Sequence, residues 1–224
     1  MSKATPLVWM MAGGTGGHIM PGLAVADWLR ARGCEVKWVG NPEKMEGQLV
    51  PAAGYEMIAV KFAGVRGKSL WARLKAPFGL LGAMFKLWRA MSTSKPALVV
   101  GMGGYVAMPG GLVARLRKVP IVLHEQNAIA GKTNLWLARL TPNQLEGFPG
   151  ALPQGHWVGN PVRHAMTQLP APQERYSQRN GPLRVLVVGG SLGAAALNEA
   201  VPLALARMDD GERPEVTHQS GQQH

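Results

Sequence analysis

Three glycine-rich segments each follow an apolar stretch and precede a helical pattern, as phosphate-binding loops do. They are Gly13–His18, Gly101–Gly104 and Gly189–Gly193. Glycine allows the main chain to approach a phosphate closely, and the N-terminus of the next helix supplies free N–H groups with partial positive charge. A single loop of this kind can be no more than a tight turn. Three of them at the carboxyl ends of parallel strands predict a site for a phosphorylated ligand, because ligands of open α/β sheets bind at that edge.

The familiar nucleotide signatures do not fit these loops. The pattern G-x-G-x-x-G starting at Gly14 requires glycine where Ile19 stands, and the second predicted strand ends in Val39-Gly40-Asn41, without an acid for a ribose. A P-loop ending at Gly131-Lys132-Thr133 lacks its first glycine, because Gln126 stands there. The sequence therefore disfavours a nucleotide-dependent oxidoreductase and an ATPase. No cluster of His, Cys and Asp has metal-ligand spacing, so we predict neither a metal nor a cofactor.

The elements that position these loops alternate along the chain. Apolar stretches without polar alternation predict strands of a parallel sheet that is covered on both faces. They span residues 7–11, 35–39, 55–60, 97–100, 121–124 and 183–188. Helical patterns between them complete a doubly wound, Rossmann-like α/β fold. We expect a first domain over residues 1–162, a linker with little regular structure over 163–182, and an incomplete second Rossmann-like domain over 183–224, since one strand–helix–strand unit cannot bury both faces of its strands.

The charge of the chain is concentrated in one stretch. Of the 224 residues, 46% are apolar and 17% are charged, which is typical of a folded domain, and the single Cys34 fits a reducing compartment. The net charge is +11, yet residues 57–124 contain eleven Lys or Arg and no acidic residue, so the whole excess lies there. Such a block predicts an anionic partner: nucleic acid, a membrane surface or phosphorylated ligands.

Within this basic stretch, residues 69–91 combine bulky apolar side chains at helical spacing with cations. The pattern is typical of a helix at a membrane interface, although a helix that covers a sheet also has an apolar face. We expect both roles, because one buried stripe does not use all the large apolar residues, and we expect Pro77 to divide the segment or to start a second helix. No pattern supports nucleic acid as the partner. The residues expected to contact the membrane are Leu70, Trp71, Leu74, Phe78, Leu81, Phe85 and Trp88.

Five motifs, in their order along the chain, closely resemble those of the MurG family. They are Gly13–His18, Gly101–Tyr105, His124–Asn127, Val158–Arg163 and Val188–Ser191. These proteins are peripheral membrane glycosyltransferases of the two-domain GT-B fold. The resemblance covers essentially the whole chain. It implies inverting transfer of GlcNAc from UDP-GlcNAc to the 4-hydroxyl of MurNAc in lipid I, which gives lipid II for peptidoglycan synthesis, without an obligatory metal.

The resemblance also implies a place in the cell and a set of partners. It places the protein at the cytoplasmic face of the bacterial inner membrane, with UDP-GlcNAc, lipid I, the anionic membrane surface and cell-wall synthesis proteins as partners. In the family the donor-binding domain continues well past residue 224, so we expect most of the grip on the donor nucleotide to be missing. The alternative is a truncated, non-catalytic module that binds a membrane or a phosphate.

The resemblance assigns roles to single residues. Contacts to UDP-GlcNAc fall on Thr15, Gly16, Gly17, Asn127, Arg163 and Ser191. His18 is a candidate base, because histidine titrates near neutral pH and a helix N-terminus favours its neutral form; the alternative is a histidine that orients the loop. Glu125 is a second catalytic candidate, with a structural acid paired to a nearby basic residue as the alternative. Gly103, Gly104 and Tyr105 are candidates to hold the pyrophosphate of the acceptor, with a plain tight turn as the alternative.

Overall fold

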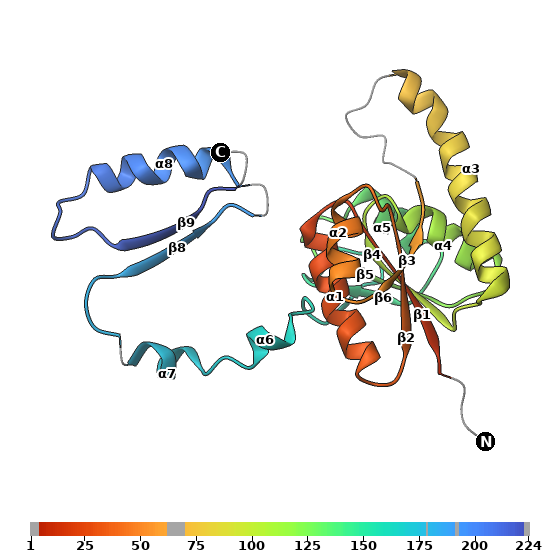
Figure 1. The fold of residues 1–224 in the computed structure, drawn as a ribbon, viewed down its shortest axis with the longest axis horizontal. Helices are drawn as coiled ribbons and strands as arrows, with labels where there is room; N and C mark the ends of the chain where they lie inside the picture. The colour runs from red at the N-terminus through yellow and green to blue at the C-terminus, as the bar shows by residue number, and fades with distance from the viewer. Residues whose placement is uncertain (1–4, 62–69, 178, 191–192, 222–224) are drawn as a thin grey trace. The chain divides into compact units, whose positions relative to one another are not determined.

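The chain folds into two compact units, Met1–Thr167 and Gln168–His224 (Figure 1). The computed structural model describes residues 5–61, 70–177, 179–190 and 193–221, and for residues 70–75 it describes the backbone alone. The first unit contains the loops after the first and fourth predicted strands. The second unit contains the third glycine-rich segment.

The first unit is built on a seven-stranded sheet with the order β3-β2-β1-β4-β5-β6-β7, in which all neighbours are parallel. The strands are β1 (Leu7–Ala12), β2 (Glu35–Gly40), β3 (Glu56–Ala59), β4 (Leu98–Gly103), β5 (Ile121–Glu125), β6 (Gln144–Glu146) and β7 (His156–Trp157). The helices are α1 (Gly16–Arg30), α2 (Met45–Ala52), α3 (Leu70–Thr93), α4 (Ala107–Leu116), α5 (Lys132–Ala138) and α6 (His164–Thr167). The predicted Rossmann-like α/β architecture is confirmed. The strand order reverses between β1 and β4, which is where ligands bind in such sheets.

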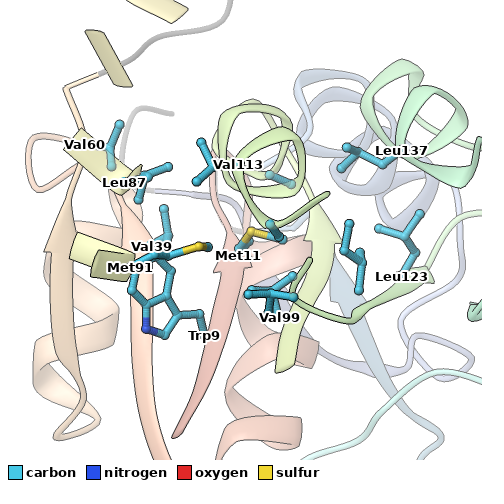
Figure 2. Close-up of a cluster of buried hydrophobic side chains, with 14 of the residues drawn as sticks. Trp9, Met11, Val39, Val60, Leu87, Met91, Val99, Val113, Leu123 and Leu137 are labelled. Carbon is cyan, nitrogen blue, oxygen red and sulfur yellow. The ribbon is translucent and has the colours of Figure 1, made fainter. Parts of the chain in front are cut away.

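Each face of the sheet carries its own apolar core, because successive side chains of a strand point to opposite faces. On one face, Trp9 and Met11 of β1 pack with Val99 and Leu123 under α3, α4 and α5 (Figure 2). On the other face, Met10 packs among residues of α1 and α2. All six residues of β1 are therefore buried. The loop after β1 starts from the most deeply enclosed strand of the unit.

One prediction from the sequence differs from the structure, and one strand, β6, was not predicted. The helix α3 runs unbroken from Leu70 to Thr93 with Pro77 inside it, so the expected division at Pro77 is wrong. Proline removes only one N–H donor near the start of this helix, and the later turns are held by burial of Ala83, Leu87 and Met91 in the core. The strand β6 has no apolar pattern, since two of its three residues are the buried Gln144 and Glu146.

The second unit contains one strand–helix–strand motif. The strands β8 (Arg184–Val188) and β9 (Glu215–Gln219) are parallel neighbours, and α8 (Ala195–Ala206) connects them. Residues alternate along both strands between exposed and half-buried, so one face of this small sheet is open to solvent. The segment predicted as a linker contains the short helices α6 and α7 (Pro172–Ser177), and neither of them has a buried residue.

The loops after β1 and β4 touch main chain to main chain. Gly103 and Gly104 have φ values of +105° and +79°, in the left-handed region that favours glycine. A Cβ added to Gly104 would lie 2.1 Å from the carbonyl oxygen of Gly13, and one added to Gly103 would lie 2.9 Å from Cε1 of His18. The two glycine-rich loops therefore form one packed pair at the point where the strand order reverses.

This packing predicts that Gly104→Ala is much more costly than the same change at Gly33, which has φ +80° and no atom within 4 Å of an added Cβ. Gly33→Ala adds backbone strain alone and should lower the free energy of unfolding by about 1–2 kcal/mol. Gly104→Ala adds a collision with main-chain atoms, which no rotamer relieves, and should lower it by about 2–5 kcal/mol. Urea unfolding followed by tryptophan fluorescence measures both. Equal losses would contradict the close contact of the two loops.

Candidate functional site

The first glycine-rich loop leads into α1 with free backbone donors. Thr15 is the N-cap, with φ −139° and ψ 155°, and its carbonyl oxygen accepts the N–H groups of His18 (3.1 Å) and Ile19 (3.2 Å). The N–H groups of Gly16 and Gly17 precede these, and helical geometry gives them no partner within α1. The first turn carries no acidic residue. The loop can therefore hold a phosphate or another anion at the N-terminus of this helix.

A buried carboxylate, that of Glu46 in α2, ties three loops together. It accepts hydrogen bonds from the backbone N–H of Gly14 (3.1 Å), the backbone N–H of Asn41 (3.2 Å) and the hydroxyl of Tyr105 (2.6 Å). These donors follow β1, β2 and β4. Burial and the bond to Glu46 raise the pKa of the Tyr105 phenol, so that it remains a donor. Nothing in the local sequence marks Glu46 as a site residue, because an acid in the first turn of a helix is a common helix start.

Gly103, Gly104 and Tyr105 are the candidates for holding the acceptor pyrophosphate. In the structure they form a tight turn, as the alternative interpretation of these residues predicts. Gly103 and Gly104 make the turn itself, and the hydroxyl of Tyr105 is committed to Glu46. The turn lies beside His18, since a Cβ added to Gly103 would lie 2.9 Å from Cε1 of that ring. Contact of these three residues with an acceptor stays a prediction.

Glu125, at the end of β5, is completely buried and surrounded by donors. Its carboxylate accepts the backbone N–H of Asn127 (3.0 Å), the side-chain amide of Asn127 (2.8 Å), the backbone N–H of Gly131 (3.0 Å) and the side-chain amide of Asn134 (2.9 Å). Burial alone would raise the pKa of Glu125, but these hydrogen bonds outweigh it and hold the pKa below its usual value. A general base needs a pKa near the working pH and access to the substrate.

These contacts favour the structural alternative for Glu125, with amides rather than basic residues as partners, and its catalytic role stays a prediction. The carboxylate organises the loop from Asn127 to Gly131. Asn127 is exposed, and one of the two hydrogens of its side-chain amide is directed to Glu125. Arg163 is exposed just before α6. Ser191 lies outside the described residues.

His18 connects the first loop to the end of β5. Its Nδ1 lies 2.8 Å from Oε1 of Gln126. The Nε2 atom of Gln126 lies 2.7 Å from the carbonyl oxygen and 3.0 Å from Nδ1 of His124, and Nε2 of His124 lies 2.9 Å from the carbonyl oxygen of Gly159. Four residues from three separate segments thus form one hydrogen-bonded chain. His124 and Gln126 lie in a motif that the sequence singles out, but no role could be assigned to either residue. Their partners His18 and Gly159 are remote in sequence.

Comparison with known proteins settles the family. Residues 8–144 match the model of the glycosyltransferase family 28 N-terminal domain. The chain belongs to glycosyltransferase family 28. This family assignment agrees with the fold and with a glycine-rich loop at the strand-order reversal. Among the described residues, no group of three or more His, Cys, Asp or Glu is placed to hold a metal ion.

Two relatives within this family extend the comparison to the whole chain. A protein of Bordetella parapertussis is 58% identical over 221 residues, which are 99% of this chain and 62% of that protein. One of Burkholderia thailandensis is 53% identical over 224 residues, 100% of this chain and 61% of that protein. Both are named UDP-N-acetylglucosamine--N-acetylmuramyl-(pentapeptide) pyrophosphoryl-undecaprenol N-acetylglucosamine transferase. The chain thus spans a little over three fifths of the length of these relatives.

Solved structures agree with the family. MurG of Acinetobacter baumannii is 40% identical, with a TM-score of 0.73 over 97% of this chain and 59% of that one. The glycosyltransferase of kitacinnamycin, 15% identical with a TM-score of 0.68, shares the fold. The resemblance to the MurG family that the motifs indicate is confirmed, and so is the GT-B type of fold.

The structural role of Glu125 predicts a loss of stability in Glu125→Gln. The new amide N–H group would face donors, so the free energy of unfolding at pH 7 should fall by about 2–4 kcal/mol. Because the pKa of Glu125 is depressed in the folded protein, its contribution is complete above the pKa of the unfolded chain and is lost as pH falls through the folded pKa. The difference in the free energy of unfolding between the unaltered protein and Glu125→Gln should therefore become smaller as the pH falls.

Urea unfolding at a series of pH values measures this effect, with Glu35→Gln as the control. Glu35 is an exposed carboxylate of β2 that lies 3.6 Å from Nζ of Lys37. An exposed pair of this kind contributes about 0–1 kcal/mol. A similar small loss for both variants would show that Glu125 does not hold its loop.

Proposed function

We propose that this chain is the acceptor-side part of an inverting N-acetylglucosaminyltransferase. The reaction transfers GlcNAc from UDP-GlcNAc to the 4-hydroxyl of MurNAc in lipid I and gives lipid II. The single observation that carries the proposal is the ring of His18, held by Gln126 beside an anion-binding helix N-terminus. The names of the Bordetella and Burkholderia relatives support the choice of donor and acceptor.

In this reaction His18 acts as the general base. The oxygen of the acceptor 4-hydroxyl attacks the anomeric carbon as the bond from that carbon to the UDP oxygen breaks, which inverts the configuration. The hydroxyl proton passes to His18, and UDP leaves with the bonding electrons. The base needs to be within hydrogen-bond reach of the hydroxyl and largely neutral near pH 7.

The neighbouring backbone donors suit the charges of both substrates. Thr15, Gly16 and Gly17 contact the donor at the N-terminus of α1, and Asn127 and Arg163 add polar groups to the same ligand. The turn of Gly103, Gly104 and Tyr105 lies against the first loop and faces the acceptor pyrophosphate. Close packing of the two loops supports a site in which both substrates meet near His18.

We also infer that α3 contacts an anionic lipid surface. This helix has two apolar faces: Ala83, Leu87 and Met91 are buried in the core, whereas a second row on another face is exposed. The exposed fractions in that row are 76% for Phe78, 61% for Leu81, 65% for Phe85 and 39% for Trp88. The side chains of Leu70, Trp71 and Leu74 lie outside the described residues.

Cations accompany the exposed row. Lys86 and Arg89 are exposed on α3, and the guanidinium of Arg117 lies 4.7 Å from the centre of the Trp88 ring. The first half of α3 projects beyond the rest of the first unit (Figure 1). Apolar side chains with surrounding cations suit peripheral binding to anionic head groups at the cytoplasmic face of the inner membrane. In the described part of the chain, no helix combines the length and apolar character needed to cross a bilayer.

Vesicle binding tests the lipid-facing surface. The chain should bind vesicles that contain phosphatidylglycerol more strongly than phosphatidylcholine vesicles, and the difference should shrink with added salt. Leu81→Glu removes an apolar contact of about 1.5–3 kcal/mol, so binding should weaken about tenfold or more. The control is Leu203→Glu, which adds the same charge as Leu81→Glu at a leucine of α8 that is 59% exposed. This variant should bind vesicles as strongly as the unaltered chain does. Equal binding to both kinds of vesicle would contradict the proposal.

A transfer assay tests the role of His18. The part of the Bordetella parapertussis relative beyond its match can be fused to His224, and the fusion should transfer GlcNAc from UDP-GlcNAc to lipid I. His18→Ala should reduce kcat about 10²–10⁴-fold with little change in donor binding by calorimetry. His156→Ala, at an exposed histidine of β7, is the matched control.

Two results would count against this function. Near-normal turnover by His18→Ala would exclude His18 as the base. No transfer by the unaltered fusion, together with intact vesicle binding, would favour the non-catalytic membrane-binding module.

A further inference from the structure

We propose that Gln126 is a positioning residue, which holds His18 in the tautomer with its proton on Nδ1 and leaves the lone pair on Nε2. The catalytic consequence rests on the function proposed above, but the tautomer itself does not. Gln126 contacts neither substrate in this proposal. It acts through the ring of His18.

The orientation of the Gln126 amide follows from its partners. One end of the amide lies 2.7 Å from the carbonyl oxygen of His124, and a carbonyl oxygen can only accept. That end is therefore the NH₂ group, whose second hydrogen is directed to Nδ1 of His124 at 3.0 Å. The opposite end, Oε1, faces His18. This assignment follows from donor and acceptor chemistry and does not depend on telling nitrogen from oxygen in the amide.

The tautomer of His18 follows in turn. Oε1 of Gln126 only accepts, so Nδ1 of His18 at 2.8 Å must carry the proton. In neutral imidazole the other nitrogen, Nε2, then has the lone pair. Within the described parts of the chain, Nε2 of His18 has no hydrogen-bond partner. This nitrogen is thus the one available to receive the proton of an attacking hydroxyl.

His124 connects Gln126 to Gly159, the far end of this hydrogen-bonded series. Its Nε2 lies 2.9 Å from the carbonyl oxygen of Gly159 and must donate, so Nδ1 has the lone pair that accepts from Gln126. Burial lowers the pKa of His124, which favours this neutral form. A second anchor is Asn160, whose side-chain amide donates to the backbone carbonyl of Gln126 (3.1 Å). The three hydrogen bonds that link His18, Gln126, His124 and Gly159 therefore all point one way, from His18 to Gly159.

The arrangement resembles the catalytic triad of a hydrolase in one respect: a third group orients the histidine. The two differ in the charge of that group. In a triad a third group fixes the tautomer of the histidine, and the wrong tautomer costs about 10⁴ in kcat. There the third group is a carboxylate, which also stabilises the protonated ring. Gln126 is neutral, so it orients His18 without adding a negative charge beside it.

Nitrogen NMR of the ¹⁵N-histidine-labelled 224-residue chain tests the tautomer at neutral pH. His18 should show a protonated Nδ1 and an unprotonated Nε2. In Gln126→Met, which keeps the length of the side chain and removes its hydrogen bonds, this signature should give way to a mixture of tautomers.

The control is Gln144→Met. Gln144 is also buried and also makes three hydrogen bonds, to the carbonyl oxygens of Ala138 (2.7 Å) and Thr141 (2.9 Å) and from the N–H of Gln154 (3.2 Å). Its loss should destabilise the fold similarly and leave the His18 signature unchanged. A proton on Nε2 of His18 in the unaltered chain would overturn the proposal even if Gln126→Met failed to fold. So would an unchanged tautomer in Gln126→Met.

The fusion enzyme tests the consequence for catalysis. Gln126→Met should lower kcat about 10–100-fold, a part of the general-base contribution, with KM for both substrates nearly unchanged. A normal kcat despite a lost tautomer would overturn the catalytic consequence. Absence of transfer by the unaltered fusion would instead reject the proposed function, while the NMR result would still decide the position of the proton.

Discussion

The main chains of Gly13 and Gly104 touch where β1 and β4 end side by side, and the candidate site depends on that contact. A side chain at Gly104 would collide with the carbonyl oxygen of Gly13. Because both glycines lack a Cβ, the two loops reach the same point of the sheet edge, and His18 comes to lie over Gly103. Parallel strands make this possible, since they place all their carboxyl ends at one edge.

Buried carboxylates hold the loops that surround this contact. Glu46 joins the loops after β1, β2 and β4, Glu125 organises the loop after β5, and Glu146 accepts the N–H groups of Gly150 and Leu152. Within the described residues, the hydrogen-bond donors to these three carboxylates are amides and one phenol rather than Lys or Arg. Several amide donors can stabilise a buried carboxylate without an ion pair, and here they hold the pKa values of Glu125 and Glu146 below their usual range.

The helix α3 joins the core of the first unit to its basic surface. One row of apolar side chains, Ala83, Leu87 and Met91, fixes the helix on the sheet. The second row, from Phe78 to Trp88, is left exposed among cations. The buried row holds the helix with the help of Met84 and Ala90, which also pack against the core, and the exposed row leaves apolar surface uncovered. The lipid-binding surface and the acceptor site that we propose would therefore belong to the same domain.

Local sequence was enough to predict the parallel α/β sheet, the glycine-rich loops and the basic stretch, because apolar periodicity, glycine after a strand and charge composition are properties of short segments. It was not enough for Glu46, Gln126 or the structural role of Glu125. Glu46 meets partners 32 and 59 positions away, and Gln126 meets His18 across 108 positions. No local pattern states which donor a buried acceptor will meet, so only the packing of the strands decided these contacts. The same packing kept α3 continuous through Pro77, where local propensity alone favours a break.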